Sequence, residues 1–394
     1  MVKINPSFFQ LPPSLFIEIE KKAASLKAHY PDPTMIYFNL GDVTKPLSPT
    51  LLAALCNASQ ETGDRRTFRG YGPAQGYPFL REAISYGEYR HLGISSDEIF
   101  ISNGARSDLS HIQELFAADS RIALCDPAFP QYLETTILAG RTYANIPCLE
   151  ENHFIPQPPT FAVDLIYLSS PSNPTGMALS RHDIRRWVDF ALENQAIIIM
   201  DGSYEAYISS DECPHSIYEI EGAKEVAIEI RSFSKNAGFT GLRCSYTIVP
   251  KELHASIDGK EVSLHSLWRR RHETRFGGVP YPIQKCAAAI YTPEGQKEIK
   301  EMIQTYKDRA RFLSDGLKKF GFTIYGGQNA PYIWCKTPRS MGSWDFFDHL
   351  LKRLHIVCVP GSGFGRHGEG YVRFSAYADP SQLAEGLLRL KQLF

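Results

Sequence analysis

The sequence alternates short, continuously apolar runs with longer amphipathic segments, and this pattern constrains the fold more than any other feature. The apolar runs are residues 99–101, 121–125, 165–169, 196–200 and 227–230. Apolar runs without polar alternation are typical of strands that are covered on both faces. The segments 77–92 and 181–194 between them have helical patterns, and Ser180 is expected to cap the second. Strands that alternate with helices predict an α/β fold with a mostly parallel sheet.

The last hundred residues have a different pattern. A long charged helix is expected at 294–320, and a closing helix from about 381. Short strands are expected between them, near 323–325, 332–335, 357–359 and 371–375. This order predicts a smaller α+β domain. The first 40 residues contain one expected helix, 16–28, and we expect them to pack with this domain. The chain is thus predicted to divide into a large domain, 41–285, and a small domain made of 1–40 and 286–394.

Charge and hydropathy exclude several classes of partner. The 42 basic and 43 acidic residues give a net charge of −1, whereas a protein that mainly binds nucleic acid needs a basic surface. No apolar run approaches the roughly 18 residues of a membrane helix, and residues 1–6 show no signal-peptide core. The eight cysteines are scattered without a Cys-x-x-Cys pair, and the twelve histidines have no metal-ligand spacing. We expect a cytoplasmic protein with reduced thiols, no metal, and no nucleic-acid or membrane partner.

The most informative stretch, residues 232–243, directly follows the expected strand 227–230. Ser232 and Ser234 precede Lys235, and Arg243 follows it by eight positions. A lysine amine can form a Schiff base with an aldehyde cofactor, while serines and an arginine hold an anion beside it. The stretch therefore predicts an aldehyde cofactor that carries an anionic group.

Three further junctions follow expected strands. Asp201 ends the run 196–200, with Tyr204 three residues later, at the edge where ligands bind in α/β sheets. Pyridoxal phosphate needs one such carboxylate against its ring nitrogen. Asn173 lies in the loop after 165–169, where its amide would reach the phenolic oxygen of that cofactor. Residues 102–106 end in Arg106 and form a strand-to-helix junction, whose free N–H groups make a seat for an anion. An anion seat, an Asn, an Asp and a Lys are the set that pyridoxal phosphate requires.

The order of these junctions is similar to that in the fold-type I aminotransferases, which the sequence resembles over nearly its whole length. It resembles the LL-diaminopimelate aminotransferases more closely, through residues 41–47, 70–76, 126–132 and the run 214–225 that leads toward Lys235. The resemblance implies a large domain with a mostly parallel seven-stranded sheet, a smaller α+β domain, and a homodimer with shared active sites. It also implies a pyridoxal-phosphate enzyme of lysine and diaminopimelate biosynthesis that acts on small amino and oxo acids. That enzyme would interconvert tetrahydrodipicolinate plus glutamate and LL-2,6-diaminopimelate plus 2-oxoglutarate.

The resemblance also assigns roles to individual residues. Lys235 would bind the cofactor covalently and move the proton, Asp201 would pair with the ring nitrogen, and Tyr132 would stack on the ring. The other cofactor contacts would come from Tyr71, Gly104, Ala105, Arg106, Asn173, Tyr204, Ser232, Ser234 and Arg243, with Tyr71 donated by the other subunit. The substrate would be bound by Gly41, Arg106, Tyr132, Asn173 and Arg373. Among these, Arg373 would hold the α-carboxylate with its planar fork.

Three positions depart from the pattern of these relatives. Ala74 stands where an acid often meets the distal amine of diaminopimelate, Ser14 stands near a usual aromatic residue, and Gly277 stands near a usual Asn. None of the three belongs to the expected cofactor site. They bear instead on substrate selection, and we expect the site to accept other amino donors besides LL-diaminopimelate.

Other functions fit parts of the pattern. Another class I/II aminotransferase or a β-lyase would share the same fold. A transcription regulator with an aminotransferase-like domain would carry an additional N-terminal DNA-binding domain, yet the aminotransferase pattern begins near residue 36. Residues 363–368 match Gly-x-Gly-x-x-Gly, but a dinucleotide site needs this motif between a strand and a helix. Because a strand is expected to follow, we predict a turn that places Arg373.

Overall fold

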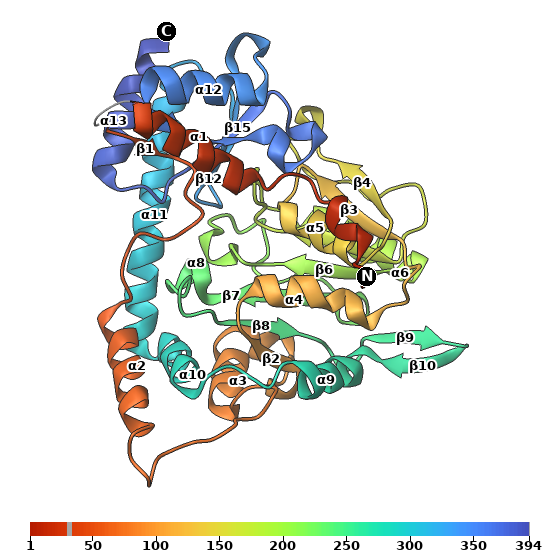
Figure 1. Ribbon diagram of the computed structural model, residues 1–394. Helices are drawn as coiled ribbons and strands as arrows, with labels where there is room; N and C mark the ends of the chain where they lie inside the picture. Colours follow the sequence, from red (N-terminus) through yellow and green to blue (C-terminus); the bar gives the residue numbers. More distant parts are fainter. Residues whose placement is uncertain (30–33, 394) are drawn as a thin grey trace.

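A seven-stranded sheet lies at the centre of the computed structural model, which describes residues 1–29 and 34–393 (Figure 1). Its strands are β2 (Ile99–Ser102), β3 (Ile122–Asp126), β4 (Tyr143–Pro147), β5 (Leu165–Ser169), β6 (Ile197–Asp201), β7 (Ala227–Ser232) and β8 (Ser245–Ile248). Their spatial order is β2-β8-β7-β6-β5-β3-β4, and only β8 runs antiparallel to its neighbours. The predicted α/β fold with a mostly parallel sheet is confirmed.

The five strands expected from the sequence are present within two residues of their expected bounds, whereas β4 and β8 were missed. β4 is an edge strand with largely exposed side chains that ends at Pro147, so it lacks the apolar run of a central strand. β8 is fully buried but contains Ser245 and Thr247. Their hydroxyls have partners, since Ser245 Oγ accepts from the Gly104 N–H at 3.0 Å and Thr247 donates to Asp108. Hydrogen-bonded hydroxyls make a polar strand compatible with burial.

Helices cover both faces of this sheet. The helices of this part of the chain are α2 (Pro49–Glu61), α3 (Pro78–Ile84), α4 (Ala105–His111), α5 (Pro130–Leu138), α6 (Arg181–Asn194), α7 (Ala223–Val226), α8 (Phe233–Asn236), α9 (Leu264–Arg275) and α10 (Tyr281–Ala288). One apolar cluster joins Ile198 of the sheet to Trp187 of α6. Another joins Ile199 of the sheet to Trp268 of α9. Ser180 caps α6 as expected, because its hydroxyl accepts from the Asp183 N–H at 3.1 Å.

A second sheet lies nearer the carboxyl terminus and is antiparallel. It contains β11 (Ile324–Gly326), β12 (Tyr332–Lys336), β15 (Tyr371–Ser375) and β14 (Val359–Pro360), in that order. β1 (Ile36–Tyr37) pairs with β13 (Ile356–Val357). A third apolar cluster contains side chains of this second sheet together with side chains of α1 (Leu15–His29), α12 (Ser343–Leu354) and α13 (Pro380–Leu390). The amino-terminal helix therefore packs with the carboxyl-terminal part of the chain (Figure 1).

The 27-residue helix α11 (Pro293–Lys319) joins the two parts of the molecule (Figure 1). Its first half contributes Met302 and Tyr306 to the cluster against the large sheet. Its second half contributes Leu313 and Leu317 to the cluster of the second sheet. One continuous helix thus fixes how the two sheets lie relative to each other, and this places the active-site candidates of both at one pocket.

Three further features complete the fold. β9 (His254–Ile257) and β10 (Lys260–Ser263) form a projecting hairpin that the sequence pattern did not predict (Figure 1).

The glycine-rich residues 363–368 form short turns that lead into β15, as expected, rather than the start of a helix. Among the described residues, no helix is long and apolar enough to cross a membrane, and all eight cysteines are unpaired.

Candidate active site

A pocket of about 620 Å³ lies at the carboxyl ends of the parallel strands, where β5, β6 and β7 end in Ser169, Asp201 and Ser232. Side chains of the second sheet and of α1 complete its walls. Twelve of the fourteen predicted site residues line it: Gly41, Ala105, Arg106, Tyr132, Asn173, Asp201, Tyr204, Ser232, Ser234, Lys235, Arg243 and Arg373. Gly104 lies directly before Ala105, and Tyr71 lies outside the pocket.

Lys235 lies on the short helix α8, directly after β7. Its ammonium donates to the carbonyl of Gly41, and the Tyr207 hydroxyl donates to the Lys235 carbonyl at 3.0 Å. Burial lowers the pKa of Lys235 to about 8, with further lowering by nearby arginines and an opposing effect of Asp42. A lysine with such a pKa carries a reactive neutral amine at far lower pH than a surface lysine.

Asp201 is the last residue of β6 and is 7% exposed. Its carboxylate accepts from the Tyr132 hydroxyl at 2.6 Å and from the Ser203 N–H at 3.0 Å. Burial raises the pKa of Asp201, and these two hydrogen bonds act against that rise. A buried carboxylate without a cation is costly, so this position favours a ligand that brings a positive charge to Asp201.

Hydroxyl and guanidinium groups gather beside Lys235. Arg243 Nη1 donates to Thr240 O at 3.0 Å and to Ser234 Oγ at 3.5 Å. Arg243 has φ = 58°, in the left-handed region that non-glycine residues seldom adopt. The Arg243 guanidinium lies against Gly104, where an added Cβ would come within 2.0 Å of Nη2. Gly104 is therefore needed for the close approach of Arg243, and together with Arg106 these groups form an anion-binding corner.

Arg373 of β15 is 1% exposed and lines the same pocket as Lys235. Its Nη1 donates to Asn173 Oδ1 at 2.7 Å, and its Nη2 donates to Asn39 O at 3.2 Å. The guanidinium stacks on Tyr332 at 4.2 Å. Its buried Nε has no hydrogen-bond partner among the described residues. A fixed guanidinium with an unused donor is suited to binding a carboxylate from a ligand.

Several residues of the pocket were not identified from the sequence. Tyr332 of β12 makes a 2.8 Å hydrogen bond with Tyr204 and supports the Arg373 guanidinium. Asn39, Asp42, Phe16 and Glu20 also line the pocket. Tyr332 lies in an expected strand, but nothing in the strand pattern tells which of its side chains faces a pocket shared with another sheet.

A buried ion cluster lies behind the pocket and was also missed. Arg231 of β7 lies 3.2 Å from Glu205 and donates from Nε to the Tyr89 hydroxyl at 2.8 Å. Glu205 follows Tyr204 in the segment after β6. The ion pair therefore links β7, which leads into Lys235 of α8, to the segment that follows Asp201 of β6 and contains Tyr204. Neighbouring Glu229 is fully buried, and burial raises its pKa to about 8.

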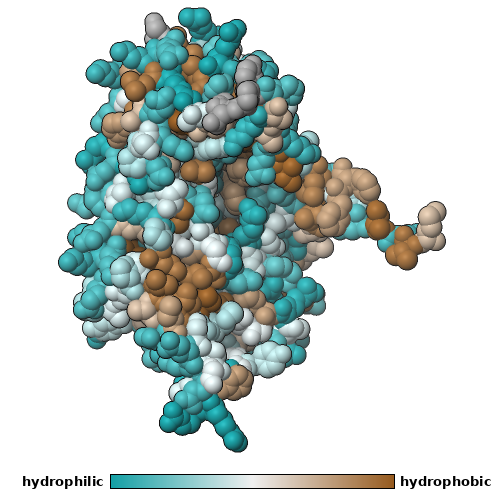
Figure 2. Space-filling model, turned by 60° about the vertical axis from the view of Figure 1, so that its left-hand side comes forward, coloured by the Kyte–Doolittle hydropathy of each residue, from teal (hydrophilic) through white to brown (hydrophobic). Residues whose placement is uncertain are grey.

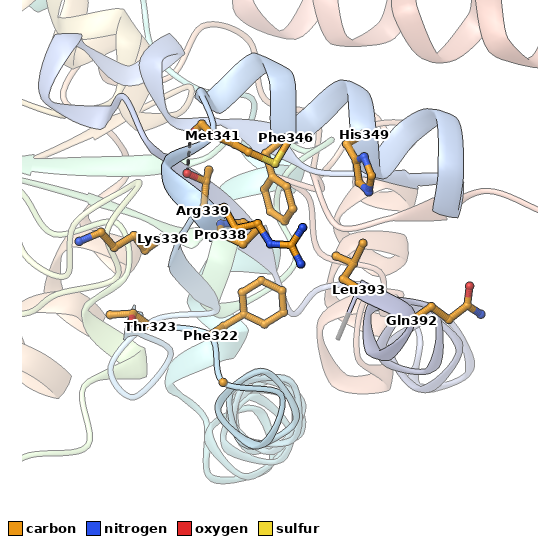
Figure 3. A pocket seen from close by; sticks show the side chains of 12 residues that line it. Phe322, Thr323, Lys336, Pro338, Arg339, Met341, Phe346, His349, Gln392 and Leu393 are labelled. Carbon is orange, nitrogen blue, oxygen red and sulfur yellow. Dashed lines mark hydrogen bonds between the residues drawn. The ribbon is translucent and has the colours of Figure 1, made fainter.

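A second cavity, of about 590 Å³, lies beside α12 and near the end of the chain (Figure 3). Phe322, Met341 and Phe346 line it, and Arg339 extends into it in this view. Lys336 at its rim is already paired with Glu150 at 2.6 Å. None of the predicted site residues lines this cavity, so the chemistry expected from the sequence is gathered in the 620 Å³ pocket.

The groups of the pocket fit pyridoxal phosphate. Lys235 supplies an amine of lowered pKa, and Asp201 supplies a buried carboxylate in need of a positive partner. Arg243, Arg106 and Ser234 supply donors for a phosphate, and Gly104 leaves room for the Arg243 guanidinium beside them. These three features lie in one pocket, and Arg373 is left for a substrate carboxylate.

The chain is similar to proteins of one kind over its whole length. It matches the family model "Aminotransferase class I and II" at residues 33–390. The LL-diaminopimelate aminotransferases of Desulfotalea psychrophila and Agathobacter rectalis are each 48% identical to it, over 100% of this chain and 99% and 100% of theirs. The solved structure of L,L-diaminopimelate aminotransferase from Chlamydomonas reinhardtii has a TM-score of 0.94 and 38% identity, and covers 100% of this chain and 99% of that one.

Proposed function

The chain belongs to the class I and II aminotransferases, and we propose that it interconverts tetrahydrodipicolinate plus glutamate and LL-2,6-diaminopimelate plus 2-oxoglutarate. It has the fold-type I architecture, and its cofactor is pyridoxal phosphate. The observation that carries the choice of substrates is the 48% identity to LL-diaminopimelate aminotransferases over full length. The reaction serves lysine and diaminopimelate biosynthesis.

Each residue of the pocket has its own role in this reaction. When bound, pyridoxal phosphate supplies an aldehyde that takes up an amino group and a ring that accepts electrons. Lys235 holds the cofactor between reactions and moves a proton to and from the substrate α-carbon. Asp201 would keep a proton on the ring nitrogen, and Tyr132 would pack against the ring.

The remaining residues orient the two ligands. Arg373, held by Asn173 and Asn39, binds the substrate α-carboxylate and so aims the α-carbon at Lys235. Gly41 contributes its backbone to substrate binding. Arg243, Ser232, Ser234 and Arg106 hold the phosphate, and Tyr204 holds the phenolic oxygen, with Gly104 and Ala105 at the phosphate end.

We also propose that the chain acts as a homodimer in the cytoplasm. Met1, Val2, Ile4, Phe8 and Phe9 are exposed apolar side chains, and Figure 2 shows such groups on a segment that projects from the body. Exposed apolar segments of this kind favour association. Unpaired cysteines throughout the chain favour a reducing compartment. In each subunit, residues 41–285 form the large cofactor-binding domain, and residues 1–40 and 286–394 form the small domain.

Mixed dimers are expected to reveal a shared active site. Tyr71 is fully exposed and lies in the connection between α2 and α3, outside the pocket of its own chain. We expect co-expressed Tyr71→Phe and Lys235→Ala subunits to be more active than either variant alone, because one site per mixed dimer has both native groups. As a control, Tyr86→Phe, also exposed, should show no gain when mixed with Lys235→Ala. No gain from the Tyr71→Phe mixture would place Tyr71 in its own subunit's site.

Attachment of the cofactor to the apo-protein is expected to speed up as pH rises toward 8 and then to level off. The Lys235 amine reacts only when neutral, and its pKa is lowered to about 8. The neutral fraction is therefore about a tenth at pH 7 and about nine-tenths at pH 9. The rate can be followed by the absorbance change on mixing. A rate that keeps rising about tenfold per pH unit up to pH 10 would mean that Lys235 has an ordinary lysine pKa.

Arg373→Lys is expected to raise KM for every amino-acid substrate by roughly tenfold to a hundredfold, with a smaller change in kcat. A lysine cannot form the planar fork and loses the geometry held by Asn173 and Asn39. Steady-state kinetics with two different amino donors measures this. Arg366→Lys, which changes an exposed arginine of the preceding turn, is the matched control. An unchanged KM in Arg373→Lys would assign the carboxylate to another residue.

A panel of amino donors tests the proposed substrates. The purified protein is given LL-diaminopimelate, meso-diaminopimelate, lysine, aspartate, an aromatic amino acid and glutamate, each with a fitting oxo acid, and kcat/KM is compared. We expect LL-diaminopimelate and glutamate to be the best donors. If aspartate or the aromatic amino acid exceeded LL-diaminopimelate, the chain would be another class I/II aminotransferase.

A further inference from the structure

One carboxylate of the pocket wall has no part in the chemistry described above. Arg106, Lys235, Arg243, Arg373 and Asp201 serve the cofactor and the α-carboxylate. The two other acidic residues of the lining are Asp42 and Glu20. Asp42 directly follows Gly41, whose carbonyl accepts from the Lys235 amine, so Asp42 lies beside the reacting group and its charge acts on that amine. Glu20 is thus the acidic group of the lining without an assigned partner.

The position of Glu20 follows from the packing of α1. Leu15, Ile19 and Ala23 are buried in the cluster of the second sheet, and they recur along one face of the helix. Phe16 and Glu20 are four residues apart on the adjacent face, and both line the active-site pocket. The Glu20 side chain is exposed and makes no hydrogen bond or ion pair with a residue that the structure describes. The fold therefore holds a free carboxylate at the pocket wall, on a helix anchored by its other face.

The charges of the pocket show which ligand would use this carboxylate. The α-carboxylate of any substrate binds Arg373, and its α-amine reacts at Lys235. A simple monoamine leaves Glu20 without a partner, and the distal carboxylate of glutamate is repelled by it. The far end of diaminopimelate carries a carboxylate and an ammonium, and the ammonium, which glutamate lacks there, is the group that can pair with Glu20. We infer that Glu20 is a specificity-determining residue that binds the distal ammonium of diaminopimelate, an inference that rests on the proposed function.

Glu20 is an acidic residue that the sequence pattern did not identify as part of the site. Position 74, an Ala, was expected to leave the distal amine without a charged partner, and Ala74 does not line the pocket of its own chain. Glu20 comes from the amino-terminal helix of the same chain that provides Lys235 and Arg373. The Glu20 carboxylate then contributes to the preference of the enzyme for LL-diaminopimelate over glutamate.

The test compares Glu20→Gln with Glu18→Gln. Glu18 lies on the same helix but lines a different pocket, of about 450 Å³. We expect Glu20→Gln to lower kcat/KM for LL-diaminopimelate about tenfold, mainly through KM, because a charged hydrogen bond to the ammonium is lost. For glutamate, kcat/KM should stay the same or rise. Glu18→Gln should change neither substrate. Without an oxo acid, the concentration of LL-diaminopimelate that gives half of the maximal rate of amino transfer to the cofactor should rise by the same factor as KM.

The outcomes separate this inference from the proposed function. If the parent enzyme uses LL-diaminopimelate but Glu20→Gln leaves the ratio of LL-diaminopimelate to glutamate within twofold, Glu20 does not bind the distal ammonium and the proposed function stands. The same conclusion follows if Glu18→Gln causes an equal loss. If the parent enzyme uses glutamate but not LL-diaminopimelate, the proposed function itself fails, and the role of Glu20 fails with it.

Discussion

Lys235→Ala protein is expected to lose covalent attachment of the cofactor and at least about 10³-fold in turnover. The expectation rests on the position of Lys235 after β7, its place in the pocket lining, and its lowered pKa of about 8. No neighbouring side chain replaces it, because the other cations that line the pocket are arginines, which stay protonated. Absorbance of the bound cofactor and steady-state kinetics measure the two losses separately.

Lys251→Ala is the matched control for this substitution. Lys251 is a half-exposed lysine 3.8 Å from Asp97, away from the pocket lining. It should leave both the spectrum and the turnover unchanged. If Lys235→Ala kept most of its activity, the cofactor lysine would have to be another residue, and the roles given to Ser234 and Arg243 would change with it.

Asp201→Ala is expected to bind the cofactor but to turn over at least about a hundredfold more slowly, equivalent to about 2.7 kcal/mol of transition-state stabilisation. In the proposed function, the carboxylate would hold a proton on the ring nitrogen, which lets the ring accept electrons from the substrate. Burial makes the effect large, because a charge pair in a site that excludes water is weakly screened. Turnover of fully loaded protein is the quantity to measure.

The substitution Asp201→Asn separates the effect of the negative charge from the effect of the side-chain shape. The amide can still accept from the Tyr132 hydroxyl, which lies 2.6 Å from the carboxylate, so the packing of the site is retained. We expect Asn to lose nearly as much turnover as Ala, since both lack the negative charge. An Asp201→Asn enzyme with unchanged kcat and fully bound cofactor would refute the proposed role of this carboxylate.

Much of the large sheet could be predicted because its central strands are buried on both faces. The strands β5 and β6 are continuous apolar runs, whereas β7 also contains Glu229 and Arg231. Each of the three ends at a polar residue of the pocket. The ends of parallel strands meet at one edge, so the amino-acid sequence alone was enough to expect Asn173, Asp201 and Lys235 together. The edge strand β4 and the polar strand β8 lack that signal and were missed.

The contacts between distant segments could not be predicted. Tyr332 and Arg373 reach the pocket from the second sheet, and Glu20 reaches it from α1. No local pattern reveals such contacts, because they depend on how α11 sets the two sheets against each other. The buried polar side chains Arg231 and Glu229 also depart from the usual apolar pattern of a strand. Their partners come from other segments, since Arg231 pairs with Glu205, and Glu229 accepts from the hydroxyls of Tyr89 and Ser216.

The most direct test of the proposed reaction is a single-turnover experiment with the purified, cofactor-loaded protein and no oxo acid. LL-diaminopimelate and glutamate are each mixed with the enzyme, and transfer of the amino group to the cofactor is followed by absorbance. The proposed function predicts complete transfer from both donors, with one equivalent of oxo product per site, and restoration of the spectrum by 2-oxoglutarate. Transfer from glutamate without transfer from LL-diaminopimelate would contradict it.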